Sequence, residues 1–416
     1  MSNYGKIEKH IATLMNATPG LKSRIKLFYQ KLNHSVYKKP YKFLLTEGVQ
    51  IKTLKTGKNR ESFWGYYDSS PFLNGSFLTH SFDLAKGTKR PDDAYIDILV
   101  DGRCVSETNS WNWQQGARLF WLDQETILHN VFEQNGYRTK IINLKSHHSF
   151  LTEQAIYAFD RLSNTAIGLN FKRLTKLDPS YGYFAHDHEN YSINDDQMDG
   201  IFSIDIEKNT SELIISIDYL KRYREKPEMK NALHGVNHIQ IAPGGQRFMF
   251  LHRWYLKSGE KFSRLFTSNK DGSDVHLLSD EGMVSHCNWK NHHEIIGWMN
   301  KNTTGNGYYL HQDKKNEFRQ IGNKVLLQDG HPSFSKCGRF MLIDTYPDRY
   351  RMSHLYLYDF TNQKRITIGS FYNPLIYYNE MRCDLHPRFS DDDSITIDTV
   401  YQGARQQVKL DISKLL

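Results

Sequence analysis

Four segments of the chain share one pattern, and each of them opens with a histidine. Each reads histidine, two further residues, an apolar position, a short polar turn and a second apolar run. The four histidines are His238, His286, His331 and His386, so the repeats start 48, 45 and 55 residues apart. A period of this length, with hairpin turns such as PGG and DDD inside the copies, is typical of the four-stranded blades of a β-propeller.

Weaker copies of the pattern precede the four strong ones. They begin near Asp68, Ala117 and Phe159, which gives seven blades. We interpret residues 173–229 as the outer strands of the third blade together with a long insertion. An aromatic content of 13% beside a hydrophobic content of 39% suits many short strands better than a helical or doubly wound fold. We therefore predict an all-β fold, a seven-bladed β-propeller over residues 51–416.

The first 50 residues form a basic arm that differs from the rest. Residues 1–46 hold nine Lys or Arg and one acid, so their net charge of +8 equals that of the whole chain. The neutral remainder argues against a nucleic-acid-binding protein. Leu21, Ile25, Phe28 and Leu32 fall at helical spacing, which predicts a short amphipathic helix. The helix either contacts an anionic membrane surface or packs against the propeller.

Cysteine usage and hydropathy bear on the cellular location. The four cysteines show neither a disulfide framework nor a CxxC zinc motif. The N-terminal residues lack an apolar core of signal-peptide length, and no run of 18 apolar residues occurs. We expect a cytoplasmic protein whose basic arm provides any peripheral contact with the inner face of the membrane.

The blade pattern gathers polar side chains at one mouth of the central channel. The residue that opens a first strand and the residues that end a second strand share one rim, and first strands line a narrow channel. Several imidazoles at this rim suit a divalent metal such as manganese or zinc. The predicted metal ligands are His238, His331, His386 and Cys383. The alternative is a hydrogen-bonded polar plug that closes the channel.

Arginines and tyrosines accompany the histidines in the sequence. A guanidinium pairs bidentately with a carboxylate, so a mouth that combines these groups suits an acidic sugar. The predicted substrate-binding residues are His129, His252, Arg349, Tyr346 and Tyr401. Arg253 and Tyr183 are further catalytic candidates beside His286.

Three motifs resemble a known family. SHCNW at 285–289, DGHPSFSKCG at 329–338 and CDLHPRFS at 383–390 resemble blade motifs of oligogalacturonate lyases, and propeller-type ulvan lyases are similar in layout. The resemblance implies cleavage of uronate-containing oligosaccharides by β-elimination with a divalent metal. It implies His286 as general base, Arg264 as partner of the substrate carboxylate, and His331 and His386 as metal ligands.

The chain departs from this family at two positions. The family has a Gln and a second His just before the last metal histidine, where this chain has Met381 and Asp384. Either Asp384 replaces one ligand, or Cys383 binds zinc instead.

The sequence thus supports two classes of function. The first is a metal-assisted lyase that acts on an acidic oligo- or polysaccharide. The second is a non-catalytic carbohydrate-binding or assembly propeller in the biosynthesis of capsule or O-antigen, which the missing signal peptide favours. A peptidase or a glycosyltransferase is disfavoured, because neither a GxSxG motif nor a glycine-rich phosphate loop is visible.

Overall fold

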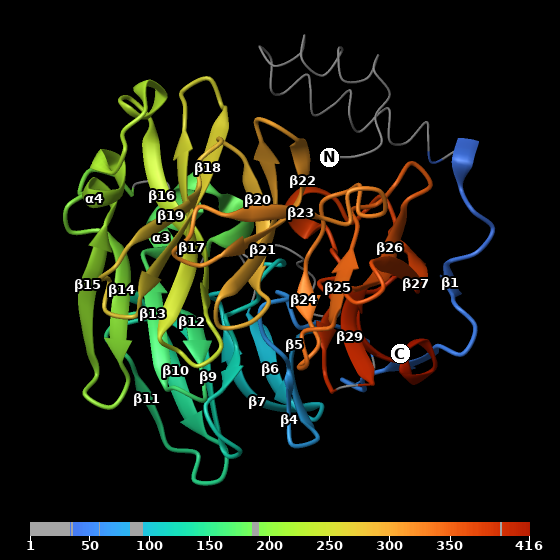
Figure 1. Cartoon of the computed structure of the whole chain (residues 1–416). Helices are drawn as coiled ribbons and strands as arrows, with labels where there is room; N and C mark the ends of the chain where they lie inside the picture. The colour runs from blue at the N-terminus through green and yellow to red at the C-terminus, as the bar shows by residue number, and fades with distance from the viewer. Residues whose placement is uncertain (1–33, 35, 58, 84–94, 185–190, 392) are drawn as a thin grey trace.

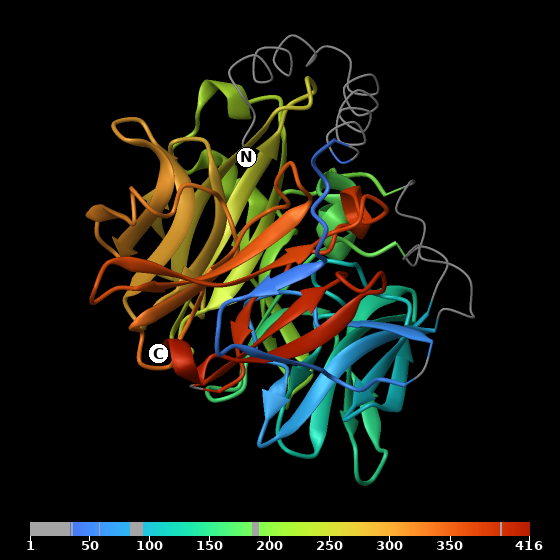
Figure 2. The same ribbon diagram turned by 90° about the vertical axis from the view of Figure 1, so that its right-hand side faces the viewer.

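The computed structural model is a seven-bladed β-propeller, as the sequence predicts (Figures 1 and 2). It describes residues 34, 36–57, 59–83, 95–184, 191–391 and 393–416. The predicted amphipathic helix at residues 21–32 lies outside these residues. Among the helices that the structure does describe, none is long and apolar enough to cross a membrane.

Blades 1 to 5 follow one another along the chain, and their strands are antiparallel neighbours. Blade 1 holds β3 (Arg60–Phe63), β4 (Phe72–Leu73), β5 (Ser76–Asp83), β6 (Ile96–Val100) and β7 (Arg103–Thr108); blade 2 holds β8 (Phe120–Trp121), β9 (Thr126–Glu133), β10 (Gly136–Asn143) and β11 (Ser149–Leu151); blade 3 holds β12 (Ile156–Asp160), β13 (Thr165–Leu169), β14 (Gly200–Asp205) and β15 (Thr210–Ser216); blade 4 holds β16 (Leu233–Ile241), β17 (Arg247–Tyr255), β18 (Lys261–Asn269) and β19 (His276–Ser279); blade 5 holds β20 (Val284–Trp289), β21 (Glu294–Lys301), β22 (Gly305–Gln312) and β23 (Phe318–Ile321).

Blades 6 and 7 combine strands from both ends of the chain. Blade 6 holds β24 (Ser333–Phe334), β25 (Phe340–Asp344), β26 (Met352–Asp359), β27 (Lys364–Tyr372) and, outermost, β1 (Phe43–Leu45); blade 7 holds β28 (Arg388–Phe389), β29 (Ser394–Thr399), β30 (Gln406–Asp411) and, outermost, β2 (Gln50–Thr53). β1, inside the segment expected to be the arm, pairs with β27, and β2 pairs with β30. The N-terminal strands therefore cover two outer edges that would otherwise be open.

The third blade carries the long insertion that the sequence predicts. Its outer strands β14 and β15 pair in the second half of residues 173–229. Four short helices lie around them, namely α3 (Phe171–Leu177), η3 (Pro179–Tyr181), α4 (Ile217–Arg222) and η4 (Pro227–Met229). Two more short helices, η5 (Asn379–Met381) and η6 (Ser413–Leu415), lie near the C-terminus. Residues of η3 contact η5 of the blade 6–7 connection, so insertion and connection meet over the channel mouth.

A buried carboxylate links the last blade to the first. Asp398 of β29 accepts hydrogen bonds from the backbone N–H groups of Trp64 and Gly65, both at 2.9 Å, directly after β3. The Arg388 guanidinium pairs with the same carboxylate at 3.0 Å, and both side chains are 2% exposed or less. The ring of blades is thus joined by strand pairing at the rim and by the backbone hydrogen bonds to Asp398, whose charge the Arg388 guanidinium of the same blade balances.

Asp398→Asn removes the charge of this link while its shape is retained. We expect a loss of about 2–4 kcal/mol in the free energy of unfolding, because the Arg388 cation is left buried without its partner. Urea unfolding followed by circular dichroism measures the loss. Asp205→Asn breaks the exposed pair with Lys208 and serves as the control with an unchanged midpoint. Equal midpoints for the two variants would contradict the account.

Candidate functional site

Each of the seven blades contributes one or two side chains to the ring around the channel, from its first strand or from the residues just before it. Blade 1 supplies the pair Tyr66–Tyr67 after β3; the following blades supply Arg118, Tyr157, His238, His286, His331 and His386. Arg118, His238 and His386 have positive φ angles of 51°, 54° and 43°. A non-glycine residue in this region is strained, and such residues cluster at functional sites. Since two of these three residues are channel histidines, we expect the functional site at the histidines of blades 4 to 7.

The four histidines of blades 4 to 7 come together as the sequence repeat predicts. The ring centroids of His286 and His331 lie 4.2 Å apart, those of His331 and His386 lie 4.3 Å apart, and His238 lies 5.9 Å from His286. All four are at most 3% exposed. The Tyr66 ring contacts three of them, at 5.5 Å from His238, 6.3 Å from His331 and 5.2 Å from His386.

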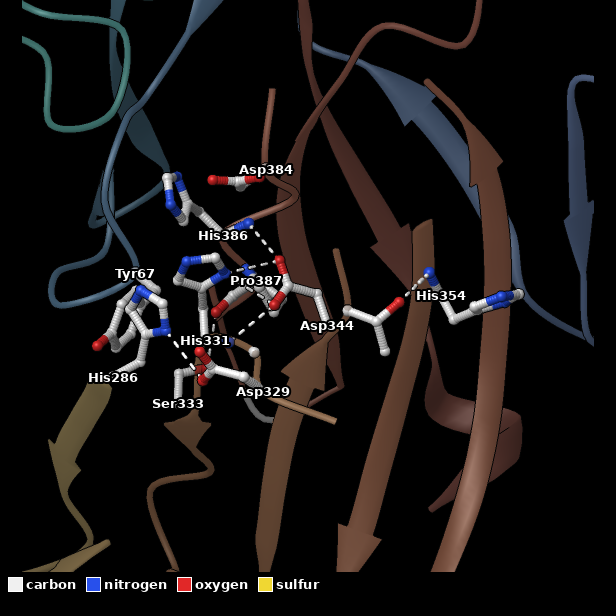
Figure 3. A network of polar contacts seen from close by, with 12 residues as sticks. Tyr67, His286, Asp329, His331, Ser333, Asp344, His354, Asp384, His386 and Pro387 are labelled. Atoms are coloured by element: carbon white, nitrogen blue, oxygen red, sulfur yellow. Dashed lines mark hydrogen bonds and ion pairs between the residues drawn. The ribbon is translucent and has the colours of Figure 1, made fainter. Parts of the chain in front are cut away.

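Asp344, the last residue of β25, holds two of these histidines (Figure 3). Its carboxylate accepts the backbone N–H of His331 at 2.8 Å and that of His386 at 3.1 Å. It also accepts from Nδ1 of His331 at 2.8 Å, which leaves Nε2 as the free lone pair of that ring. Burial lowers the pKa of His331, but the Asp344 carboxylate outweighs burial and the pKa lies above its ordinary value.

His286 is oriented by a second carboxylate. Its Nδ1 donates to Asp329 at 3.1 Å, and the Ser285 hydroxyl donates to the other oxygen of Asp329 at 2.7 Å. With its proton on Nδ1, the ring carries its lone pair on Nε2. Burial lowers the pKa of His286 despite the nearby Asp329, so the imidazole is neutral at pH 7. A neutral, oriented imidazole is suited to general-base chemistry.

Three side chains meet the requirements of a metal site. Ligand atoms of His331, Asp384 and His386 all lie within 4.8 Å of one another, and all three residues are buried. Nε2 of His331 and Nε2 of His386 have no hydrogen-bond partner. Burial raises the pKa of Asp384, but Arg382 and then His331 outweigh it, so the pKa lies below its ordinary value and the group is a carboxylate. Two imidazoles and a carboxylate suit a divalent manganese, zinc or iron ion.

Two predicted metal ligands lie outside this group. Cys383 packs with Tyr377 and Val400, and burial raises the pKa of its thiol to about 12, so it remains protonated. His238 faces Tyr66 and Tyr181 instead, at ring distances of 5.5 and 5.1 Å. Of the two ways in which the sequence could replace the family's second histidine, the geometry favours Asp384 over Cys383.

Arg264 and His252 do not reach the histidine group. They are cross-strand partners in blade 4, where Arg264 Nε donates to His252 Nδ1 at 3.1 Å. His252 then bonds His234 at 3.0 Å, and Arg264 also donates to the Leu220 carbonyl at 2.6 Å. Successive side chains of a strand point to opposite faces, so Arg253 lies on the other face of β17. Arg264 and His252 are thus parts of a buried packing network.

Four other predicted residues are also placed away from the group. Tyr183 stacks on Phe171 at 4.3 Å and accepts from Asn130, whereas His129 bonds Ser106 at 2.9 Å. Tyr401 packs against Phe43 and Phe371, and the exposed Arg349 lies over Tyr37 and Tyr350. The first three are buried: His129 lies within the second strand β9, Tyr401 follows the second strand β29, and Tyr183 follows η3 in the insertion of blade 3.

Tyr346 and Arg253 do lie at the mouth, together with residues that were not predicted. The Tyr346 ring is 6.2 Å from His286 and 5.8 Å from His331. The residues missed as part of the site are Tyr66, Tyr67, Asp329 and Arg382, whereas Tyr181 and Asp344 are expected at the mouth from the blade pattern. Tyr66 and Tyr67 directly precede the first predicted blade start at Asp68, which is the signal that could have identified them.

Comparisons with known proteins agree on the fold. No family model matches the chain, and no curated protein matches its sequence. An oligogalacturonate lyase from Vibrio parahaemolyticus superposes with a TM-score of 0.60 at 15% identity, over 89% of this chain and 96% of that one. An oligogalacturonate lyase in complex with manganese gives a TM-score of 0.59 at 13% identity, over 90% and 97%. The resemblance seen in the sequence motifs is thus confirmed at the level of the propeller fold.

His331→Ala and Asp384→Ala are expected to abolish stoichiometric binding of manganese or zinc, because each removes one of three ligands. Metal content after dialysis and titration calorimetry measure the effect. Cys383→Ser is the matched control, since it changes a neighbouring sulfur that lies outside the group, and it should retain the metal. Loss of metal in Cys383→Ser with retention in Asp384→Ala would reverse the assignment.

The buried His129 makes stability depend on pH. Burial lowers the pKa of His129 to about 4, whereas an unfolded histidine titrates near 6.5. Below pH 6.5 the unfolded chain binds a proton that the native chain does not, so stability falls with pH by about 1.4 kcal/mol per unit down to about pH 4. His129→Gln should remove about this slope in urea unfolding between pH 6.5 and 5, whereas the exposed His148→Gln should leave the slope unchanged. An unaltered slope in His129→Gln would refute the account.

Proposed function

We propose that this propeller is a metal-assisted lyase that cleaves uronate-containing oligosaccharides by β-elimination. The observation that carries the proposal is the oriented, neutral imidazole of His286 directly beside the group of His331, Asp384 and His386. The fold on which they stand is that of structures named as oligogalacturonate lyases. A divalent metal held by these three residues would supply Lewis-acid charge to the uronate carboxylate and so acidify the C5 proton.

The residues of the chain then provide the proton transfers. His286 Nε2 removes the C5 proton while Asp329 stabilises the imidazolium that forms. The electron pair of the broken C–H bond forms the C4–C5 double bond, and the glycosidic oxygen at C4 leaves. The Tyr346 phenol, at the ring of His286, donates a proton to that oxygen. Burial raises the pKa of Tyr346 well above 10, so the phenol is protonated at neutral pH.

A second candidate function is a non-catalytic propeller that binds an acidic glycan during the assembly of capsule or O-antigen. The burial of the histidines and the pairing of Asp384 with Arg382 at 2.7 Å favour it, because both suit a closed polar plug. Under either function the partner is an acidic oligo- or polysaccharide, and we retain the cytoplasmic location and the membrane contact of the basic arm as proposals.

The ultraviolet absorbance of unsaturated uronate product distinguishes the two functions. With manganese and a panel of uronate oligosaccharides, His286→Ala should lower the elimination rate by about 100-fold or more, and Tyr346→Phe should also lower it. Tyr401→Phe alters a phenol outside the site and should keep the rate within about twofold. Absence of product with every glycan, from protein that holds its metal, would exclude the lyase and favour the binding module.

A further inference from the structure

His238 is a buried group that the metal site and the proposed elimination do not use. It is 2% exposed, and both of its ring nitrogens lack a hydrogen-bond partner. Its backbone is held in a strained conformation at a bulge in β16, where its N–H bonds the Tyr157 hydroxyl at 3.2 Å and the Asn237 side chain at 2.7 Å. A buried imidazole without partners is costly unless a ligand satisfies it.

Two cations of blade 4 share one carboxylate, that of Asp178, which directly precedes η3. Arg253 pairs with Asp178 through Nη1 at 2.6 Å, and Lys261 approaches the same carboxylate oxygen at 3.5 Å. The charge of Arg253 is the main cause that lowers the pKa of Lys261, which indicates that Asp178 does not neutralise both cations. Arg253 and Lys261 also lower the pKa of His238, after burial. One carboxylate balances only one of the two cations, so a net positive charge remains beside η3, whose Tyr181 contacts the unsatisfied imidazole.

Arg253 also retains an unused edge. Its Nε is buried without a partner, whereas the contact with Asp178 uses Nη1. The Nε side of a guanidinium is a planar fork that matches the two oxygens of a carboxylate. Tyr181, which η3 places against His238 at 5.1 Å, adds a phenol beside this edge.

On the far side of Tyr181 stands the ion pair of Arg382 with Asp384, so the charge there is balanced. The excess of cations therefore lies on the blade 4 side of the mouth.

We propose that Arg253, Lys261, His238 and Tyr181 form a carboxylate-binding subsite of the channel mouth, distinct from the metal group and specific for an acidic sugar. The inference deepens the proposed function and rests on it for the identity of the ligand as a uronate. The subsite adjoins the proposed base, since His238 lies 5.9 Å from His286. It selects a uronate over the neutral sugar of the same shape, because only the acid satisfies the excess positive charge.

Binding of trigalacturonate to the full-length protein tests the subsite. Titration calorimetry in EDTA, with absorbance monitored to exclude cleavage, compares Lys261→Gln with Lys257→Gln. Lys257 lies in the turn between β17 and β18 and is exposed, so both variants remove one charge from the same hairpin. Since a charge-assisted contact contributes about 1.5–3 kcal/mol, Lys261→Gln should weaken binding about tenfold or more, and Lys257→Gln less than about twofold. Arg253→Gln should weaken it further.

Neutral and sulfated galactose trisaccharides complete the experiment. The neutral sugar should bind more weakly than trigalacturonate and should be insensitive to Lys261→Gln. The sulfated sugar is also an anion, so Lys261→Gln should weaken its binding, but it should bind more weakly than trigalacturonate because the planar carboxylate matches the guanidinium of Arg253. Equal affinities of Lys261→Gln and Lys257→Gln for trigalacturonate, or no preference for the carboxylated sugar, would overturn the subsite even if the protein cleaves uronates. Selective binding that depends on Lys261, without any unsaturated product in the presence of manganese, would support the subsite and refute the lyase. Since the Lys261 side chain is 46% exposed, its substitution leaves the fold intact.

Discussion

One carboxylate, that of Asp344, sets the geometry on which the candidate site depends. It joins blade 6 to blade 7 through the backbone of His386 and fixes both the backbone and the ring of His331. The backbone of Gly330 lies so close to that of Asp344 that a Cβ at Gly330 would lie 1.9 Å from the Asp344 carbonyl oxygen. This explains why a glycine precedes His331. Because the Asp344 bond takes Nδ1 of His331, Nε2 is the only nitrogen that the ring can offer to a metal.

The four histidines occupy equivalent positions, and their partners give them different chemistry. His331 has a carboxylate on one nitrogen and a free lone pair on the other. His286 has the Asp329 carboxylate as well but lies outside the group of metal-ligating atoms. Neither ring nitrogen of His238 has a hydrogen-bond partner, and its ring contacts Tyr66 and Tyr181. A repeat can therefore supply one residue type at one position, while the loops between the repeats decide which groups each ring pairs with and which of its nitrogens stays free.

The sequence predicts the blades and the histidine group well, because both follow from a repeat whose strand starts meet at the channel. It predicts the second-strand residues poorly. The sequence places His129, His252 and Tyr401 at the ends of second strands. In the structure His129 and His252 lie within β9 and β17, Tyr401 follows β29, and all three side chains pack into blade contacts. The expectation that Arg264 lies at the mouth fails for the same reason, because the cross-strand partner of Arg264 is His252 and not Arg253. Arg382 comes from the blade 6–7 connection, which no periodicity describes.

The pairing of Asp384 with Arg382 balances a charge that a neutral histidine at this position would not bring. Replacing an imidazole ligand with a carboxylate adds a negative charge to a buried group, which would repel the carboxylate of a substrate. The adjacent Arg382 guanidinium, 2.7 Å from Asp384, restores the charge balance and keeps the pKa of that carboxyl low. Both charges stand at the edge of the mouth where η3 meets η5. The charges of Arg382 and Asp384 therefore balance each other, whereas Arg253 and Lys261 share the single carboxylate of Asp178.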